Sequence, residues 1–489
     1  MFKILLLLLF SLSTIYAHSK DAIVDIGVIA GETMSLDTEK SFGLKLKKII
    51  LGSNLYIDDY LINNYLFTVG NRVFRHSSNN ILPINYFILD SEVLNAFASF
   101  GGNIVIHKAI FLITDSESEL AALLAHEIAH VNQRHVVRML RDIQRKGPLT
   151  VSGIATSVLL MILYPPIGVL TAAATTGAMY QDRINYTRNH EEEADAIAFE
   201  TLRKANFDPQ GSVNLFSRFF SKSGSYSYIP EILLTHPIPE NRINAARASM
   251  NFNRLKPYHE SEDYLYAKYR LDIMYFDVDV KKLIVKYEHI KSNSKKKSKQ
   301  FRAASYALAL IYFELKKYVK AINEISGLIK EDLHYDKDFL LDIYSKILYK
   351  LGYKDKAIRV LDEYRSVYGD SYVSNHNLAD FYSDQKQYRE ALNVLLSFKE
   401  YADQKYSAYN LNISTYEKIV DLSFRLEEYY LYHIFRSELY VYLGKYDNAI
   451  LEIRDAQKYT KGDNLILQSS RAKIDEISKL RDKMDNLEL

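Results

Sequence analysis

The sequence predicts a mainly α-helical protein, in which a domain with one small β-sheet is followed by a solenoid of paired helices. Two observations support this fold class. In the first half, apolar residues recur at helical spacing around a His-Glu-x-x-His motif, and short apolar runs typical of strands precede it. In the second half, small and large residues recur at the spacing of stacked helix pairs.

The first 17 residues have the pattern of a signal peptide. Lys3 supplies the positive charge, residues 4–12 form a short apolar run, and Ala17 suits the position before cleavage. The apolar run is too short for a comfortable transmembrane helix. We therefore predict export with removal of residues 1–17, and the alternative is an uncleaved N-terminal anchor.

Composition limits the classes of site and partner. The net charge is only +2 over 489 residues, so no global basic field points to nucleic acid as a partner. The chain has no cysteine, which excludes disulfides and thiolate metal sites. Any metal ion must therefore be bound by histidine and carboxylate side chains.

Two helices and two strands are predicted ahead of the motif. Tyrosine and leucine residues at helical spacing favour the helices, and short β-branched runs favour the strands. The predicted helices span residues 43–52 and 56–77, and the predicted strands span residues 84–89 and 104–107.

The segment between the two strands is a candidate substrate-binding strand. A glycine pair, Gly101-Gly102, stands before the second strand and allows a close approach of backbone. In a peptidase, an edge strand near the metal ion can pair with an extended substrate. An ordinary hairpin explains the residues equally well. The candidate substrate-binding residues are Asn95, Ala96, Phe97 and Ala98.

The His-Glu-x-x-His motif predicts a zinc site. His126 and His130 are four residues apart and lie on one face of a helix, so both rings can bind a single Zn²⁺. Glu127 is placed to hold and deprotonate a zinc-bound water. Residues 118–137 contain no glycine or proline, as expected of one helix. The alternative is a buried helix with two hydrogen-bonded histidines and an incidental glutamate.

A third zinc ligand must come from outside this helix. Residues 188–195 are predicted to open a second helix, in which Glu191 and Asp195 are four apart and share a face. One carboxylate can bind zinc while the other supports a ligating imidazole. The alternative is a solvated helix N-terminus rich in glutamate.

Residues 149–180, between the two predicted metal helices, form the most apolar part of the mature chain. The first apolar run of this segment, residues 151–163, would form a 13-residue helix. Such a helix is about 20 Å long, which is short of the roughly 30 Å hydrocarbon core of a membrane. We therefore predict a hairpin rather than two transmembrane passes. A lid over the active site, a peripheral membrane contact and a buried core hairpin all stay open.

Taken together, these motifs resemble the zinc peptidases of the HtpX and CAAX-prenyl-protease family, over roughly residues 40–250. The resemblance implies a zincin-type domain with one Zn²⁺ per chain. It implies that His126, His130 and Glu191 are zinc ligands and that Glu127 is the general base. It also implies that Asp195 supports one of these ligands without binding the zinc ion itself. One departure is Ser99-Phe100, where some relatives carry proline, and it concerns the shape of that strand. Further matches are Asn95 to Ala98, Gly101-Gly102, His135, Thr235-His236-Pro237 and Arg242-Ile243.

His236 is a candidate fourth ligand. Pro237 biases it towards an extended conformation in a loop. A histidine on a loop can occupy the open zinc position at rest and move away to stabilise the tetrahedral intermediate. The alternative is a surface histidine without a role at the metal.

The second half of the chain is predicted to be a repeat array. Residues 256–300 are predicted as a helical connector that ends in a basic stretch, and residues 301–489 as the repeats. In each of four units a large residue follows a small one by three positions, and an alanine follows nine positions later. This spacing resembles tetratricopeptide repeats, which form concave protein-binding surfaces. An extra helix is predicted near residues 410–426, and the alternative is a non-repeat bundle. The four units are Ala309, Tyr312 and Ala321; Ser345, Leu348 and Ala357; Ala379, Tyr382 and Ala391; and Ser437, Tyr440 and Ala449.

The order of the parts also resembles periplasmic proteases that assist the assembly of outer-membrane β-barrel proteins. In this order a peptidase domain (18–255) follows the signal peptide and precedes the connector and the repeats. The resemblance implies an exported zinc metalloendopeptidase with chaperone activity. It would promote assembly of such proteins, degrade misassembled ones, and contact them and the β-barrel assembly machinery through the repeats. The alternatives are a periplasmic chaperone or scaffold with a mainly regulatory zinc site, and a secreted peptidase that acts on host proteins.

Overall fold

The structure of the protein is a computed structural model. This structure describes residues 34–146, 177–223, 260–331, 338–405 and 412–487, together with Ile232, His236, Arg242, Asn244, Arg247 and Tyr258. The predicted signal peptide, most of the apolar hairpin (149–176), Thr235, Pro237 and Ile243 lie outside the described residues.

A small three-stranded sheet stands at the centre of the first half. Its strands are β1 (Asn85–Leu89), β2 (Ala96–Ser99) and β3 (Asn103–His107). β3 is the middle strand, and it pairs in parallel with β1 and antiparallel with β2. Both predicted strands form, within one residue of the expected bounds. The candidate substrate-binding segment forms β2, which is an edge strand and one arm of a hairpin with β3.

The turn of this hairpin, η1 (Phe100–Gly102), explains the glycine pair. Gly101 and Gly102 have φ angles of 68° and 80°, in the left-handed region that favours glycine. A Cβ on Gly101 would lie 2.7 Å from the Cα of Gly43, so helix α3 (Leu36–Leu51) packs directly on the turn. The predicted close backbone approach is confirmed. Phe100, just before the glycine pair, is buried against Phe42, with ring centroids 6.0 Å apart.

Helix α6 is the core of the first half, because every one of its residues is buried. It packs against β2, α4, α10 and α11. Ser116 caps its N-terminus by accepting a hydrogen bond from the backbone N–H of Glu119. The helices of this half are α3 (Leu36–Leu51), α4 (Tyr60–Phe74), α5 (Ala109–Ile113), α6 (Glu117–Asn132), α7 (His135–Lys146), α10 (Gly177–Lys204) and α11 (Gln210–Ser223).

Helix bounds differ from prediction in three places. The first two helices begin at Leu36 and Tyr60 rather than at residues 43 and 56. The run 118–137 is not one helix, because the chain turns between α6 and α7 at Arg134, whose φ is 52°. The second metal helix was predicted to open at residues 188–195 and instead begins at Gly177, within the predicted apolar hairpin. Its acidic residues therefore lie inside a helix, where tertiary contacts rather than helix-end effects decide their environment.

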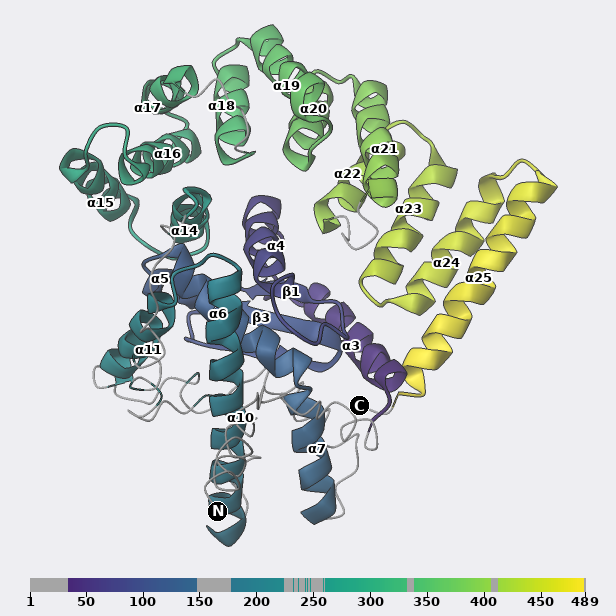
Figure 1. Cartoon of the computed structure of the whole chain (residues 1–489). Helices are drawn as coiled ribbons and strands as arrows, with labels where there is room; N and C mark the ends of the chain where they lie inside the picture. Colours follow the sequence, from purple (N-terminus) through teal and green to yellow (C-terminus); the bar gives the residue numbers. More distant parts are fainter. Residues whose placement is uncertain are drawn as a thin grey trace, which may run out of the picture.

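The second half is a solenoid of helix pairs that arches over α4 (Figure 1). Figure 1 shows the arc running from α14 to α25, with α4 on its inner side. The helices are α14 (Asp263–Met274), α15 (Val280–Asn293), α16 (Lys299–Glu314), α17 (Tyr318–Glu331), α18 (Asp338–Lys350), α19 (Lys354–Tyr368), α20 (Tyr372–Asp384), α21 (Tyr388–Lys405), α22 (Ile413–Arg425), α23 (Tyr429–Tyr442), α24 (Tyr446–Ala456) and α25 (Asn464–Asp485).

The repeat spacing has a simple structural cause. In each predicted unit the carbonyl of the large residue accepts a hydrogen bond from the backbone N–H five positions later, for example Lys317 to Tyr312 at 2.8 Å and Gln387 to Tyr382 at 2.9 Å. That bond closes the turn between two helices, and the unit's alanine lies in the first turn of the second helix. The alanines are buried where the two helices cross. The extra helix near 410–426 is α22.

The array and the first half form one continuous core. The carboxylate of Asp59, which caps α4, lies 2.6 Å from Nε of Arg270 on α14. At the other end of the arc, Lys45 of α3 donates hydrogen bonds to the carbonyls of Met484 and Leu487 at 3.0 and 2.8 Å. The array is therefore held to α3 and α4 at both ends. No helix among the described residues is long and apolar enough to span a membrane.

Candidate metal centre

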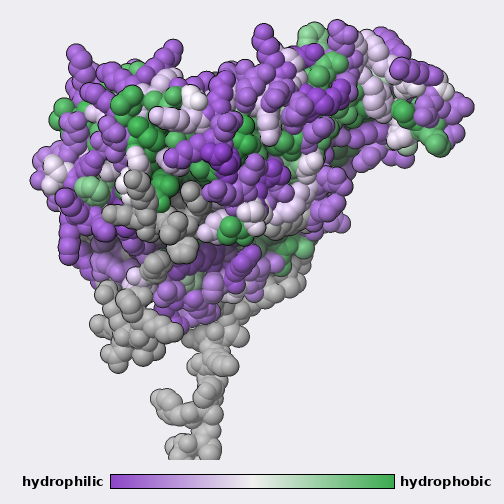
Figure 2. Space-filling model, turned by 90° about the horizontal axis from the view of Figure 1, so that it is seen from above, coloured by the Kyte–Doolittle hydropathy of each residue, from purple (hydrophilic) through white to green (hydrophobic). Residues whose placement is uncertain are grey.

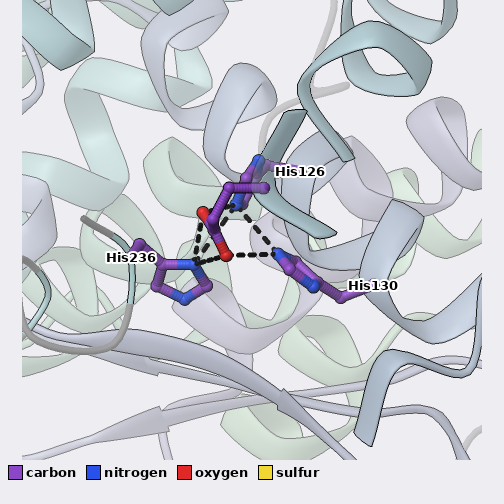
Figure 3. Close-up of side chains that lie close together, drawn as sticks. His126, His130 and His236 are labelled. Carbon is purple, nitrogen blue, oxygen red and sulfur yellow. Dashed lines mark hydrogen bonds and ion pairs between the residues drawn. The ribbon is translucent and has the colours of Figure 1, made fainter. Parts of the chain in front are cut away.

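Four side chains converge between α6 and α10. His126 and His130 come from α6, Glu191 from α10 and His236 from the segment after α11, and their nearest donor atoms all lie within 4.8 Å of one another. Figure 3 shows the three histidine rings pointing towards one another. His126 Nε2 lies 3.0 Å from His130 Nε2 and 3.3 Å from His236 Nδ1. The Glu191 oxygens lie 3.1 to 3.3 Å from the same three nitrogens.

These separations fit a tetrahedral zinc ion. A Zn²⁺ with ligands at about 2.0–2.1 Å places neighbouring donor atoms roughly 3.3 Å apart. Five of the six separations within the set, at 3.0 to 3.3 Å, lie close to that value, and all four donor atoms lie within 4.8 Å of one another. The buried imidazoles of His126 and His130 direct their Nε2 atoms at each other, 3.0 Å apart. A cation bound between them would interact favourably with both nitrogens. The donor set of three nitrogens and a carboxylate is of the kind zinc prefers.

Asp195 and Arg242 surround the donor set. Asp195 Oδ1 lies 3.0 Å from His126 Nδ1, the ring nitrogen that faces away from the cluster. Arg242 is 4% exposed; it binds Asp195 and also places Nη1 3.0 Å from Glu191 Oε2. The sequence indicated Asp195 as a supporting residue but gave Arg242 only as a motif match. Its role depends on the fold, because 47 positions separate it from Asp195.

The charges of the cluster favour ionised carboxylates. Burial would raise the pKa of Glu191, but His236, His126 and His130 hold it well below its usual value. Burial would lower the pKa of His126, but Glu191 and Asp195 raise it to about 10. Burial lowers the pKa of His130 to about 4, so this ring stays neutral at physiological pH. The ionised Glu191 and the neutral His130 ring therefore present acceptor atoms suited to a cation.

Glu127 lies beside the cluster without a hydrogen-bond partner among the described residues. It is fully buried, and its Oε1 lies 3.5 Å from Nε2 of His236. A buried carboxylate without a donor costs free energy unless water or a ligand supplies one. A cavity of about 20 Å³ adjoins both Glu127 and His126, and this volume is sufficient for one water molecule.

Comparison with known proteins identifies the family. Residues 62–250 match peptidase family M48. A beta-barrel assembly-enhancing protease from Yersinia pestis is 35% identical over 77% of this chain and 76% of its own length. One from Escherichia coli (strain K12) is 31% identical over 96% of this chain and 93% of its own length.

The chain belongs to this family of M48 proteases. Membership makes it a metalloprotease, and the donor set described above is where this chain could hold the metal ion. A solved tetratricopeptide repeat protein from Parabacteroides merdae covers 55% of the chain at 14% identity, with a TM-score of 0.28. That score is too low to bear on the fold, which rests on the helices and turns themselves.

In this M48 protease the candidate substrate-binding residues lie next to the metal helix. β2 packs against α6, which carries His126 and His130. Asn95 and Ala96 are buried, whereas Phe97 and Ala98 are half-buried. The structure thus brings an edge strand to the metal helix, and its binding of substrate stays a prediction.

The backbone of His236 is better anchored than a free loop would be. Its N–H donates to the carbonyl of Ile232 at 2.8 Å, a bond of helical spacing. The N–H of Ile232 in turn donates to the carbonyl of Leu94, just before β2, at 3.1 Å. The segment that carries His236 is therefore tied to the lead-in of the candidate substrate strand.

Three residues beside the metal centre had no role in the sequence analysis. His135 lies next to His130 and contacts Glu193, and His190 stacks on His135 with ring centroids 4.1 Å apart. The only sequence signal was the histidine five positions after the motif and the run of three glutamates. Glu191 is 2% exposed, so the interpretation of that run as a solvated helix N-terminus is wrong.

Proposed function

We propose that this protein is an exported zinc endopeptidase that cleaves unfolded or stalled outer-membrane β-barrel proteins. The observation that carries the peptidase proposal is the cluster of three histidines and Glu191 beside Glu127, whose carboxylate has no hydrogen-bond partner among the described residues. In this proposal His126, His130 and Glu191 hold one zinc ion per chain. Bound zinc supplies Lewis acidity, which polarises the scissile carbonyl and makes water acidic.

The residues of the chain perform the remaining steps. Glu127 accepts a proton from the attacking water and returns it to the leaving amine. Asp195, itself held by Arg242, lies 3.0 Å from Nδ1 of His126, where its charge favours a proton on Nδ1 and so leaves Nε2 free for the metal. The edge of β2 aligns an extended peptide by backbone hydrogen bonds.

His236 is proposed as a resting-state ligand that moves away for catalysis. Its Nδ1 lies 3.3 Å from Nε2 of His126 and 3.1 Å from Glu191, so it would fill the position that a catalytic zinc site leaves open. Its Nε2 lies 3.5 Å from Glu127, so a displaced ring would still lie within reach of a developing oxyanion. In the resting arrangement the enzyme is inactive, as expected of a protease that must not cleave folded substrates.

The repeat array is proposed as the site that selects clients and the β-barrel assembly machinery. Support comes from the two relatives, whose names state that they enhance β-barrel assembly. A cavity of about 340 Å³ lies between the array and α4, and it is lined by aromatic and polar residues from both halves. Tyr60 of α4 and Tyr372 of α20 stack there with centroids 4.0 Å apart.

The outer face of the array fits partner binding less well. Figure 2 shows that the surface seen from above is mainly hydrophilic, with hydrophobic residues in separate areas. The inner cavity is therefore the better candidate for binding apolar segments. We also propose a periplasmic location, chaperone activity towards assembling barrels, and a peripheral membrane contact through residues 149–180. The domain bounds 18–255, 256–300 and 301–489 belong to the same proposal.

A chaperone or scaffold with a mainly regulatory zinc site is the second candidate. The observation that favours it is His236, because four protein ligands are typical of structural zinc sites. A secreted peptidase acting on host proteins is a third possibility from sequence, and no observation of the structure favours it.

Glu127→Gln separates the first two candidates. The variant keeps the size and burial of the side chain, so zinc binding and the melting temperature should match wild type, while peptide cleavage should fall by several orders of magnitude. Zinc content is measured by metal analysis and cleavage with an unfolded β-barrel protein as substrate. Retained cleavage with retained zinc would refute Glu127 as the base. Full support of barrel assembly by the inactive variant would favour the scaffold.

A further inference from the structure

A second buried polar cluster continues from the metal centre on the far side of His130. His130 Nδ1 lies 2.8 Å from His135 Nδ1, and His135 Nε2 lies 3.2 Å from Oε2 of Glu193. Arg138 donates a hydrogen bond to the same Glu193 oxygen at 3.0 Å. His130 and His135 are 8% and 4% exposed, so water does not compete freely for these bonds.

The proton positions along this path are fixed by what each atom faces. His130 directs Nε2 at the donor set, so as a metal ligand it must carry its proton on Nδ1. That proton can only be donated to His135 Nδ1, which must then be the acceptor. His135 therefore carries its own proton on Nε2 and donates it to Glu193, a carboxylate that only accepts. Donation from His130 to His135 and from His135 to Glu193 therefore satisfies the hydrogen-bonding groups of all three residues.

The backbone around His135 is built to hold this geometry. His135 begins α7 directly after Arg134, a non-glycine residue with a φ of 52°. The Arg134 side chain is 3% exposed and is held by Glu39 of α3, with Nη2 2.7 Å from Oε2. Non-glycine residues adopt this conformation at a cost in free energy and keep it where surrounding contacts require it. The turn thus aims the His135 ring at His130.

We propose that His135 and Glu193 are positioning residues for the metal site, which hold the His130 ring in the tautomer that offers Nε2 to the metal ion. His126 has the equivalent support directly from Asp195, whereas His130 reaches its carboxylate through a second imidazole. Both carboxylates come from α10, two and four positions after the ligand Glu191. This proposal rests on the proposed metal site and adds the residues that orient its second histidine.

The test measures zinc affinity in the full-length protein, by competition with a chromogenic chelator. His135→Phe keeps the ring stack on His190 and removes both hydrogen bonds, and we expect zinc to bind about 10- to 100-fold more weakly. His135→Asn is the rescue, because its amide oxygen can accept the His130 proton where Nδ1 did. We expect it to recover most of the lost affinity.

His190→Phe is the matched control, because it changes another buried imidazole of the same stack and removes none of the atoms that join His130, His135 and Glu193. It should leave zinc affinity at the wild-type value. The absorption bands of the Co²⁺-loaded protein give a second readout, because a rotated His130 ring changes the ligand field. We expect the bands to shift in His135→Phe and to stay in place in His190→Phe.

Equal zinc affinity of His135→Phe and His190→Phe would overturn the proposal, as would a His135→Asn variant as weak as His135→Phe. If His135→Phe does not fold, Glu193→Met decides, since it roughly keeps the size of the side chain but removes the oxygen that accepts the proton of His135 Nε2. Zinc affinity at the wild-type value in Glu193→Met would then overturn the proposal. A wild-type protein that binds no zinc would instead refute the metal site itself.

Discussion

Arg242 binds Asp195 through two parallel hydrogen bonds, from Nε to Oδ2 at 2.6 Å and from Nη2 to Oδ1 at 2.8 Å. The same guanidinium lies 3.0 Å from Glu191, so one cation holds two carboxylates that face His126. This planar, two-bond arrangement is one that arginine makes and lysine cannot.

Arg242→Lys should therefore disturb the metal site while keeping the charge. We expect zinc affinity to fall about 10-fold, because Asp195 loses the group that fixes it against His126. The free energy of unfolding should fall by about 1.5–3 kcal/mol with the loss of buried charged hydrogen bonds. Chelator competition and urea denaturation measure the two effects.

The control is Arg203→Lys, which alters an ion pair with Glu200 on the surface of α10, where both side chains are about half exposed. Arg203→Lys should change the free energy of unfolding by no more than about 0.5 kcal/mol, and zinc affinity by no more than the equivalent factor. An Arg242→Lys variant indistinguishable from Arg203→Lys would show that Asp195 holds its position without the arginine.

His236→Ala tests the proposed resting-state ligand. Three ligands remain, so zinc should stay bound. If the ring only blocks the metal at rest, cleavage of folded proteins should rise; if it also stabilises the oxyanion, cleavage of unfolded substrate should fall by about 10²- to 10³-fold. Activity and specificity both equal to wild type would leave His236 without a role at the metal.

Ala357→Phe tests the helix crossing within the repeats. Ala357 is fully buried at the start of α19, and a larger side chain should overpack the crossing and cost about 1–3 kcal/mol of unfolding free energy. Binding to assembly partners should weaken, while zinc content stays at one ion per chain. Val367→Phe on the same helix is the control, because Val367 is 70% exposed and its change should be nearly neutral. Equal stability of the two variants would mean that the helix crossing at Ala357 can accommodate a phenylalanine side chain without overpacking.

Asp338 predicts a dependence of stability on pH. Burial, with Asp342 and Asp263 nearby, raises its pKa to about 6, although Tyr364 donates a hydrogen bond to it. Because its pKa is higher in the folded protein than the ordinary value near 4, the folded state binds the proton more tightly. Its contribution to stability is therefore present below pH 4 and is lost as pH rises to 6.

Asp338→Asn should remove this dependence, since asparagine can still accept from Tyr364 and carries no charge. Because Asp338 is only half-buried, we expect a gain of about 1–2 kcal/mol at pH 7.5 and little change at pH 4, measured by urea denaturation at both pH values. Asp362→Asn, which changes an exposed carboxylate on α19, is the control. A gain at pH 4 equal to that at pH 7.5 would contradict the proton linkage.

The sequence by itself determined the features that depend on local spacing. The pairing of His126 with His130, the shared face of Glu191 and Asp195, the glycine turn at Gly101 and the repeat turns all involve residues within a few positions of one another. For such neighbours the period of the helix or the φ angle of one residue fixes the geometry, whatever the rest of the chain does.

Only the tertiary structure decided which distant side chains complete the site. Arg242 reaches Asp195, Glu193 reaches His135, and Lys45 binds the carbonyl of Met484 across contacts that no sequence period encodes. The start of α10 at Gly177 was also missed, because its first turns are continuous with an apolar run that hides the boundary. These contacts depend on how helices pack, and packing is set by the shape of the whole core rather than by any short segment.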